Sequence, residues 1–146
     1  MNLTRHTDYA LRLLLLLAAR KDKTPVPIPE AARLYGISQN HLMKVVKTLA
    51  EHGFLRTVRG RTGGLRLAMP AGKISLGAVV RATEGHFAMF ECMAPGGQCR
   101  IVRCCRLPAV MHKALDAFLA VLDRSSIEDM VKDNPELKGL LGAPNG

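Results

Sequence analysis

The chain has 146 residues, four cysteines and a formal net charge of +9. This length suits one folded unit with its own core, which needs no disulfide bonds to fold. The apolar run from residue 13 to 19 lies between Arg12 and Arg20 and is far shorter than the roughly 20 residues of a membrane-spanning helix. Asp8 and Arg12 and the lack of a small-residue cleavage site argue against a secretory signal peptide. We therefore expect a cytoplasmic protein with no membrane partner.

The charge is unevenly distributed along the chain. Residues 1–70 contain 12 Lys and Arg against 4 Asp and Glu, whereas residues 71–146 contain 9 against 8. A basic first region joined to a nearly neutral second region indicates an anion-binding unit coupled to something else. We expect the two regions to form one compact domain overall.

The first 53 residues predict three helices. The first runs from a Thr4 cap to about residue 19. The second begins near residue 28, because prolines at 25, 27 and 29 precede or open it, and this helix ends at Gly36. Ser38 caps the third helix, which ends at Gly53 and places apolar residues at i, i+3, i+4 and i+7. Two helices joined by a glycine-containing turn, the second polar and basic at its start, are typical of a helix-turn-helix.

A basic hairpin is predicted directly after these helices. The segments FLRTVR and LRLA read as two short strands, and Gly63 and Gly64 in the intervening GRTGG are expected to supply positive φ angles for the turn. The hairpin carries four arginines, at positions 56, 59, 61 and 66. GRTGG is not a phosphate-binding P-loop, since no strand–loop–helix frame surrounds it. We predict a mainly α fold in which residues 1–70 form a winged helix-turn-helix that binds DNA.

Residues 71–146 are predicted to contain a cysteine loop and a dimerisation helix. Ser75 caps a short helix closed by Gly85, and a long helix runs from Pro108 to about residue 124. The broad apolar stripe of the long helix suits packing on its own domain and on a second subunit. Residues 125–128 have capping-box spacing for a brief last helix, and we expect residues 140–146 to be frayed.

All four cysteines lie in one segment, ECMAPGGQCRIVRCCRL, as Cys92, Cys99, Cys104 and Cys105. They lack the paired CxxC spacing of a structural zinc site. Three ligands with the spacing Cys92-x6-Cys99-x5-Cys105 can wrap an iron–sulfur cluster and leave Cys104 unused, and arginines at 100, 103 and 106 would offset the thiolate charge. From spacing alone a zinc ion and thiol-based redox chemistry remain open as alternatives.

Beyond these single features, the chain resembles a known family over nearly its whole length. LTRHTDYALRLLLLLA, GIS-x2-HLMKVV, VRGRTGGLRLA and C-x6-C-x5-CRL followed by FLAVLDRSSIEDM are similar to segments of iron–sulfur transcription regulators of the IscR/NsrR type. The resemblance is strongest to the nitric-oxide-sensing repressors among them. It implies a homodimer with one cluster per subunit, a 4Fe–4S cluster in preference to a 2Fe–2S cluster, and detoxification genes as targets.

The resemblance also implies the ligands of the cluster. Cys92, Cys99 and Cys105 would come from one subunit, and Asp8 from the partner subunit. From the sequence alone Asp8 would be read as a surface ion pair with Arg12, four residues further on. IscR-like members have a histidine three residues past the third cysteine, where this chain has Pro108, so an IscR-like ligand set is not expected.

A regulator of this type would dock two recognition helices in successive major grooves of a palindromic operator, about 34 Å apart. The residues expected to contact DNA are Ser38, Gln39, Asn40, His41 and Lys44 in the third helix and Arg59 and Arg61 in the wing. Alternatives are a sensor of iron–sulfur status or of oxidants on the same scaffold, and a cluster-free thiol regulator. An enzyme is not expected, because no catalytic triad, paired carboxylates or dinucleotide fingerprint is present.

Overall fold

The computed structural model describes residues 2–20 and 22–142. Its elements are, in chain order, α1 (Arg5–Ala19), α2 (Ile28–Tyr35), α3 (Gln39–Glu51), β1 (Leu55–Val58), β2 (Gly64–Leu67), the 3-10 turn η1 (Ala71–Lys73), α4 (Leu76–Thr83), the 3-10 turn η2 (Glu91–Met93), α5 (Leu107–Asp123), α6 (Ile127–Val131) and α7 (Pro135–Gly142). The prediction of a mainly helical chain with one small hairpin is confirmed.

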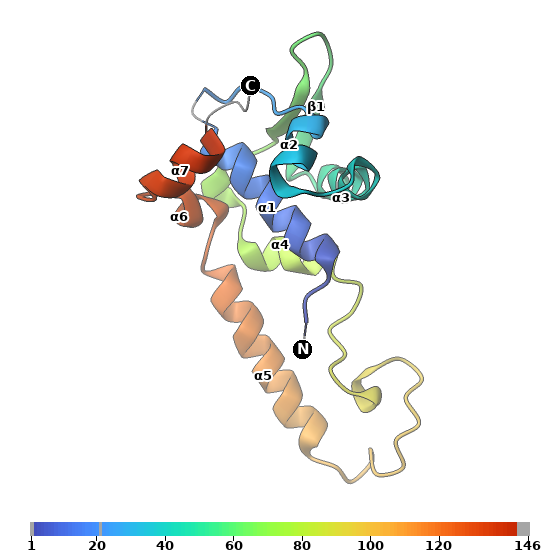
Figure 1. Ribbon diagram of the computed structural model, residues 1–146. Coiled ribbons are helices and arrows are strands. Elements are labelled where there is room, and N and C mark those ends of the chain that lie inside the picture. The colour runs from blue at the N-terminus through green and yellow to red at the C-terminus, as the bar shows by residue number, and fades with distance from the viewer. Residues whose placement is uncertain (1, 21, 143–146) are drawn as a thin grey trace.

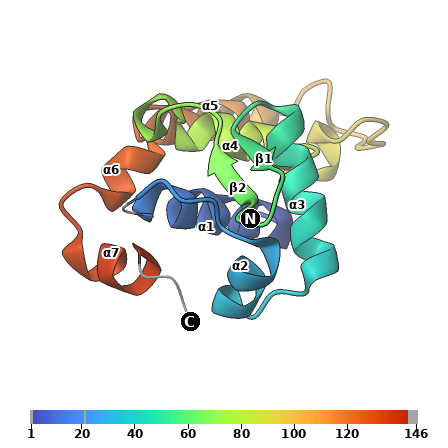
Figure 2. The same ribbon diagram turned by 90° about the horizontal axis from the view of Figure 1, so that it is seen from above.

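Helix α1 is the centre of the packed part of the molecule. It contacts α3, α4, α6, α7 and β2, so that elements from both ends of the chain share one hydrophobic core (Figures 1 and 2). Leu13, Leu14 and Leu16 are fully buried, and the helix begins at the predicted cap, where the Thr4 hydroxyl accepts a hydrogen bond from the Thr7 amide at 3.3 Å. A helix that is apolar over most of its circumference is one that packs against neighbours on several sides.

The helix-turn-helix forms as predicted from α2 and α3. Gly36 ends α2 in the left-handed conformation at φ 64°, which residues with a side chain rarely adopt. Two residues later the Ser38 side chain accepts a hydrogen bond from the His41 amide at 3.2 Å and starts α3. Leu42, Val45, Val46 and Leu49 of α3 are buried, which fixes the face of the helix that points away from the core.

Strands β1 and β2 form the predicted antiparallel hairpin, with Arg56 opposite Arg66. Val26, in the segment before α2, pairs with Leu65 as an isolated bridge and holds the hairpin against the helices. The glycine prediction was partly wrong: positive φ values fall on Gly60 and Gly64 and not on Gly63. Gly63 is required for space instead, since a Cβ there would lie 2.3 Å from the Val58 carbonyl oxygen.

The C-terminal segment differs from the prediction in two places. The capping box is shifted by one residue, because Ser126 and Asp129 cap each other's backbone amides at the start of α6. The expectation of a frayed tail was wrong for residues 140–142, which belong to α7, where Leu141 packs into the core. Residues 143–146 lie outside the described part of the chain. The long C-terminal arm of the sequence therefore folds back onto α1.

Helix α5 and the cysteine loop stand away from this packed head (Figure 1). Leu119 is the one buried residue in α5, and an ion pair between Arg81 of α4 and Asp123 near the end of α5 joins the helix to the head. Val110 and Val121 remain 60% and 63% exposed. Within the described residues no helix is both long and apolar enough to cross a membrane.

Candidate DNA-reading surface and cysteine loop

The polar residues predicted to read DNA lie together at the start of α3. Gln39, Asn40 and Lys44 are exposed, and the Ser38 hydroxyl already serves as the helix cap. His41 is half-buried, so one edge of its ring faces the protein. The structure thus exposes Gln39, Asn40 and Lys44 at the start of α3, away from its buried leucines and valines, as a helix entering a groove requires.

The arginines of the wing lie beyond the ends of the two strands. Arg59 and Arg61 are exposed and flank Gly60, whose φ of 115° makes the tight connection. Neither arginine takes part in an ion pair within residues 2–20 and 22–142. A cationic, unpaired hairpin tip suits contact with a phosphate backbone or a narrow minor groove.

The cysteine loop contains no buried residue between positions 84 and 106. Cys92, Cys99 and Cys105 are half-buried, Cys104 is exposed, and all four are free thiols. Backbone hydrogen bonds from Cys104 and Cys105 to the Ile101 carbonyl, at 3.1 and 2.9 Å, form a short turn around the cysteine doublet. The segment is held mainly by local turns and has few contacts with the head.

The single chain does not bring the predicted ligands into a coordination sphere. Among the described residues no three His, Cys, Asp or Glu side chains form a group that could hold a metal ion. The donor chemistry nevertheless fits an iron–sulfur cluster, because three reduced thiols lie on one irregular loop among arginines at 100, 103 and 106. A loop with no buried side chain can also close around such a group without disturbing the core.

Asp8 forms the ion pair that the sequence suggested. Its carboxylate accepts from Arg12 Nε at 2.9 Å and from a terminal nitrogen of Arg12 at 2.8 Å, with both side chains nearly half exposed. An exposed pair four residues apart on a helix contributes about 0.3–0.5 kcal/mol. The carboxylate is therefore easily available to another partner.

Two contacts join the start of α1 to the recognition helix. The Tyr9 ring meets the His41 ring edge-on, with centroids 4.9 Å apart, and His6 Nε2 lies 3.0 Å from the Thr48 hydroxyl. Burial lowers the pKa of His6, the nearby His41 lowers it further, and Glu84 partly opposes both. His6 is therefore mostly neutral at pH 7 and can share a hydrogen bond with Thr48.

Glu84 ties the same end of α1 to the end of α4. Its carboxylate accepts from the Thr4 amide at 2.8 Å, from the Thr4 hydroxyl at 3.0 Å and from the Thr7 hydroxyl. Burial acts to raise the pKa of Glu84, but these hydrogen bonds outweigh it, so the pKa lies below the usual value. Glu84 is also where the cysteine loop departs from the head.

Sequence reasoning did not single out these connecting residues. Nothing local in the sequence marks His6, Thr7 or Glu84, because their partners lie 42 to 80 positions away in the chain. Only the packing of α1 against α3 and α4 reveals them.

A helix-turn-helix with exposed polar residues on its second helix, a basic wing and a projecting apolar helix define a winged-helix DNA-binding regulator. The comparison with known families specifies this class. Residues 3–133 match the Rrf2 family, described as an iron-dependent transcriptional regulator. The chain belongs to the Rrf2 family and is a transcriptional regulator, not an enzyme.

Curated relatives cover almost the full length of the chain. It is 42% identical to the HTH-type transcriptional regulator NsrR of Geobacillus kaustophilus over 100% of both chains. It is 44% identical to NsrR of Bacillus subtilis over 97% of both chains. It is also 46% identical to protein aau3 of Rhizobium meliloti, over 97% of this chain and 92% of that protein.

Solved structures support the same fold. The oxidised form of Staphylococcus aureus CymR matches with a TM-score of 0.71 and 26% identity, covering 90% of this chain and 97% of that one. IscR of T. potens matches with a TM-score of 0.75 and 24% identity, covering 93% and 90%. At 24% identity the second likeness supports the fold alone.

Proposed function

We propose that the protein is a homodimeric repressor that senses nitric oxide. In this proposal Cys92, Cys99 and Cys105 of one protomer and Asp8 of the other hold an iron–sulfur cluster, a 4Fe–4S cluster in preference to a 2Fe–2S cluster. Residues 1–70 read the operator, and residues 71–146 carry the cluster loop and the dimerisation helix. The observation that carries the proposal is the contact of Tyr9, the neighbour of Asp8, with His41 of the recognition helix.

The proposed switch acts through Asp8. When bound, the cluster supplies iron atoms that react with nitric oxide. A carboxylate oxygen is a harder ligand than a thiolate and would hold such iron less firmly, so Asp8 would be the most readily exchanged of the four ligands. Arg12 offers the released carboxylate an alternative partner on the same helix, at 2.8 Å.

Once unbound, Asp8 would no longer tie the start of α1 to the partner's cysteine loop. His6 and Tyr9, on either side of Asp8, contact Thr48 and His41 of α3, so a shift of α1 moves the recognition helix. Two recognition helices bind a palindromic operator only while they stay about 34 Å apart. A coupling of about 1–3 kcal/mol between ligation and DNA binding would weaken binding about 5- to 150-fold.

The proposed DNA contacts are those predicted from the sequence: Ser38, Gln39, Asn40, His41 and Lys44 from α3, and Arg59 and Arg61 from the wing. The exposed amides of Gln39 and Asn40 suit hydrogen bonds to base edges. Ser38 caps the helix through its hydroxyl, so its own contact with DNA would be through the same oxygen or the adjacent backbone.

The test compares three forms of the protein on a fragment of its promoter. Protein purified without oxygen should contain iron and sulfide and should shift the fragment, and nitric oxide should abolish the shift, with derepression of detoxification genes in the cell. Equal binding by the cluster-loaded, cluster-free and nitric-oxide-treated forms would refute the proposal. Mössbauer spectra of the same protein decide between the two cluster types, and a response to iron–sulfur supply without a response to nitric oxide would favour the iron-status alternative.

A thiol-based regulator without a cluster is the second candidate function. It is favoured by the exposure of Cys104 next to Cys105 and by the existence of an oxidised form of the related CymR. Absorption spectra of anaerobic protein separate the two functions, because a cluster gives a visible band and thiols alone do not.

A further inference from the structure

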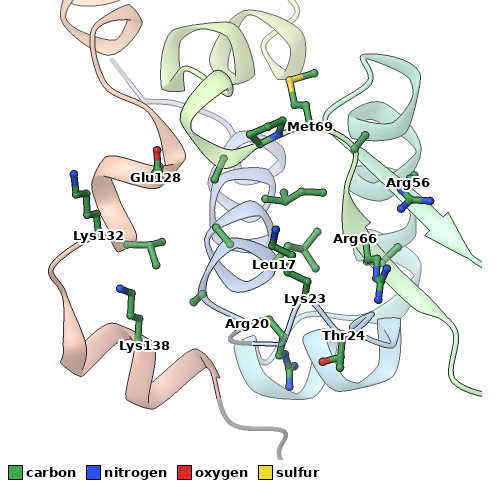
Figure 3. Close-up of a pocket in the computed structure, with 18 residues that line it drawn as sticks. Leu17, Arg20, Lys23, Thr24, Arg56, Arg66, Met69, Glu128, Lys132 and Lys138 are labelled. Atoms are coloured by element: carbon green, nitrogen blue, oxygen red, sulfur yellow. The ribbon is translucent and has the colours of Figure 1, made fainter.

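A large cavity lies on the other side of α1 from the recognition helix. Its volume is about 870 Å³, and its lining comes from the end of α1 and the segment after it, from the hairpin, and from α6 and α7. Figure 3 shows Lys132 and Lys138 on the α6–α7 side, with Arg56 and Arg66 of the hairpin opposite. A cavity of this volume is large enough for a small organic molecule.

Positive side chains far outnumber negative ones in the lining. The lining residues include six cations and one carboxylate, Glu128: the cations are Arg20, Lys23, Arg56, Arg66, Lys132 and Lys138. Of these six, Arg20 alone forms an ion pair within the described part of the chain, with Glu30 of α2. Cationic side chains that line one cavity from separate parts of the chain raise the local potential and favour an anionic ligand.

Two of the guanidinium groups have a buried Nε with no hydrogen-bond partner among the described residues. Arg20 is 6% exposed, and although its terminal nitrogen donates to Glu30, its Nε has no hydrogen-bond partner among the described residues. The Nε of Arg66 is likewise buried and without a partner there. Buried N–H groups almost always have an acceptor, and leaving one without is costly, so a ligand acceptor that reached either Nε would be stabilised.

Most of the rest of the lining is apolar. Leu17, Leu65 and Val131 are buried core residues that reach the cavity wall, together with Leu67 and Met69. We propose that this cavity is a second ligand site, which binds a small organic anion: a carboxylate, phosphate or sulfonate group faces the arginines and lysines, and an apolar body packs on the leucines. Such a ligand would bridge α1, the wing and α6–α7.

The position of the cavity favours a small molecule over the DNA backbone. Helices α6 and α7 lie on the opposite side of α1 from α3 in both views (Figures 1 and 2). Lys132 and Lys138 therefore stand across the molecule from the helix that reads the bases. The cavity is lined by the end of α1, the hairpin and α6–α7, which suits a small ligand that inserts between these elements.

The proposal is tested by calorimetry with 8-anilinonaphthalene-1-sulfonate, an organic anion with an apolar body, on the full-length protein. We expect saturable binding of the sulfonate, which octanoate should displace. N-phenyl-1-naphthylamine, which has the same ring system without the sulfonate, should bind at least tenfold more weakly. The double variant Lys23→Glu, Lys138→Glu should weaken binding of the sulfonate at least tenfold. Lys113→Glu, an equal charge reversal on α5 outside the cavity, should leave it unchanged.

Each other outcome overturns the proposal. If the double variant and Lys113→Glu bind the sulfonate with equal affinity, the probe binds elsewhere, for example on the exposed apolar residues of α5. Equal affinity for the neutral ring system would make the cavity a general apolar hollow. Displacement of the sulfonate by operator DNA, with a lowered salt dependence of DNA binding in the double variant, would assign the cations to the phosphate backbone. None of these readouts involves nitric oxide or iron, so the result is independent of the proposed function.

Discussion

The rings of Tyr9 and His41 meet edge-on at a centroid distance of 4.9 Å and an interplanar angle of 70°. Tyr9 follows Asp8 in α1, and His41 lies in the first turn of α3. The geometry is one that aromatic rings prefer, because the positive edge of one ring meets the negative face of the other. The contact therefore gives a direct physical route from the proposed ligand Asp8 to the helix proposed to read DNA.

The first prediction concerns this contact. Tyr9→Leu keeps the apolar bulk in α1 but removes the ring, and aromatic pairs contribute about 0.5–1.5 kcal/mol beyond their buried area. We expect about a 2- to 12-fold loss of operator affinity, measured by fluorescence anisotropy on cluster-loaded protein. Tyr9→Phe retains the ring and should bind as the natural protein does. Equal affinities for all three proteins would show that the contact plays no part in DNA binding.

The second prediction concerns the buried Thr7. Thr7→Val removes the hydroxyl that donates to Glu84, and loss of such a bond to a charged group costs about 1.5–3 kcal/mol. Urea unfolding at pH 7 should show this loss, whereas Thr57→Val, at an exposed strand position, should change little. A free energy of unfolding equal to that of the natural protein would mean that water replaces the hydroxyl.

The same variant should change the pH dependence of stability. The pKa of Glu84 is lowered in the folded protein, so the unfolded chain binds a proton more readily as the pH falls through about 4.5. The stabilisation by Glu84 is therefore present above that pH and is lost below it. Thr7→Val removes part of this shift, so its loss of stability between pH 7 and pH 4 should be smaller than in the natural protein.

Most of the secondary structure could be predicted because its causes are local. The caps at Thr4, Ser38 and Ser75 each accept the expected backbone hydrogen bond, and the apolar period of α3 points to its buried face. The position of the wing follows from the glycines and arginines between two short strands. Each of these features is determined by residues that are close together in the sequence.

The features that could not be predicted depend on distant parts of the chain. Helix α7 has a weak local pattern, and its place is fixed by Leu141 packing into the core around α1. The cationic cavity collects residues from positions 17 to 138, so no window of the sequence displays it. The cluster ligands remain a prediction, since a site completed by a second subunit cannot be assembled from one chain.

The third prediction concerns the wing. Arg59→Ala removes one exposed cation at the hairpin tip, so the slope of log affinity against log salt should fall by about one phosphate contact. Binding to all DNA sequences should weaken to a similar degree, as filter or anisotropy titrations at several salt concentrations would reveal. Arg124→Ala, an exposed arginine at the end of α5, is the matched control and should leave the slope as it is. An unchanged slope for Arg59→Ala would remove the wing from the interface.

The fourth prediction separates the cysteines. Cys92→Ala, Cys99→Ala and Cys105→Ala should each give anaerobically purified protein with little iron and no visible absorption band. Cys104→Ala should retain both, because Cys104 is exposed and its thiol donates to the Ile101 carbonyl at 3.4 Å. Iron and sulfide analysis checks each variant. Loss of iron in Cys104→Ala alone would transfer the ligand role to Cys104.

The last prediction concerns the exposed apolar side of α5. Val110 and Val121 are eleven residues apart, which is close to three helical turns, so both lie on the same face of the helix, and both are more than half exposed. If this face meets a second copy of the chain, Val121→Glu places an unpaired carboxylate in the interface, at a cost of several kcal/mol. The variant should elute as a monomer in size-exclusion chromatography with light scattering and should lose operator affinity. His112→Glu adds the same charge about half a turn away, on an exposed part of the helix, and this control variant should remain dimeric. If both variants are monomers, or both are dimers, this face of α5 does not form the interface.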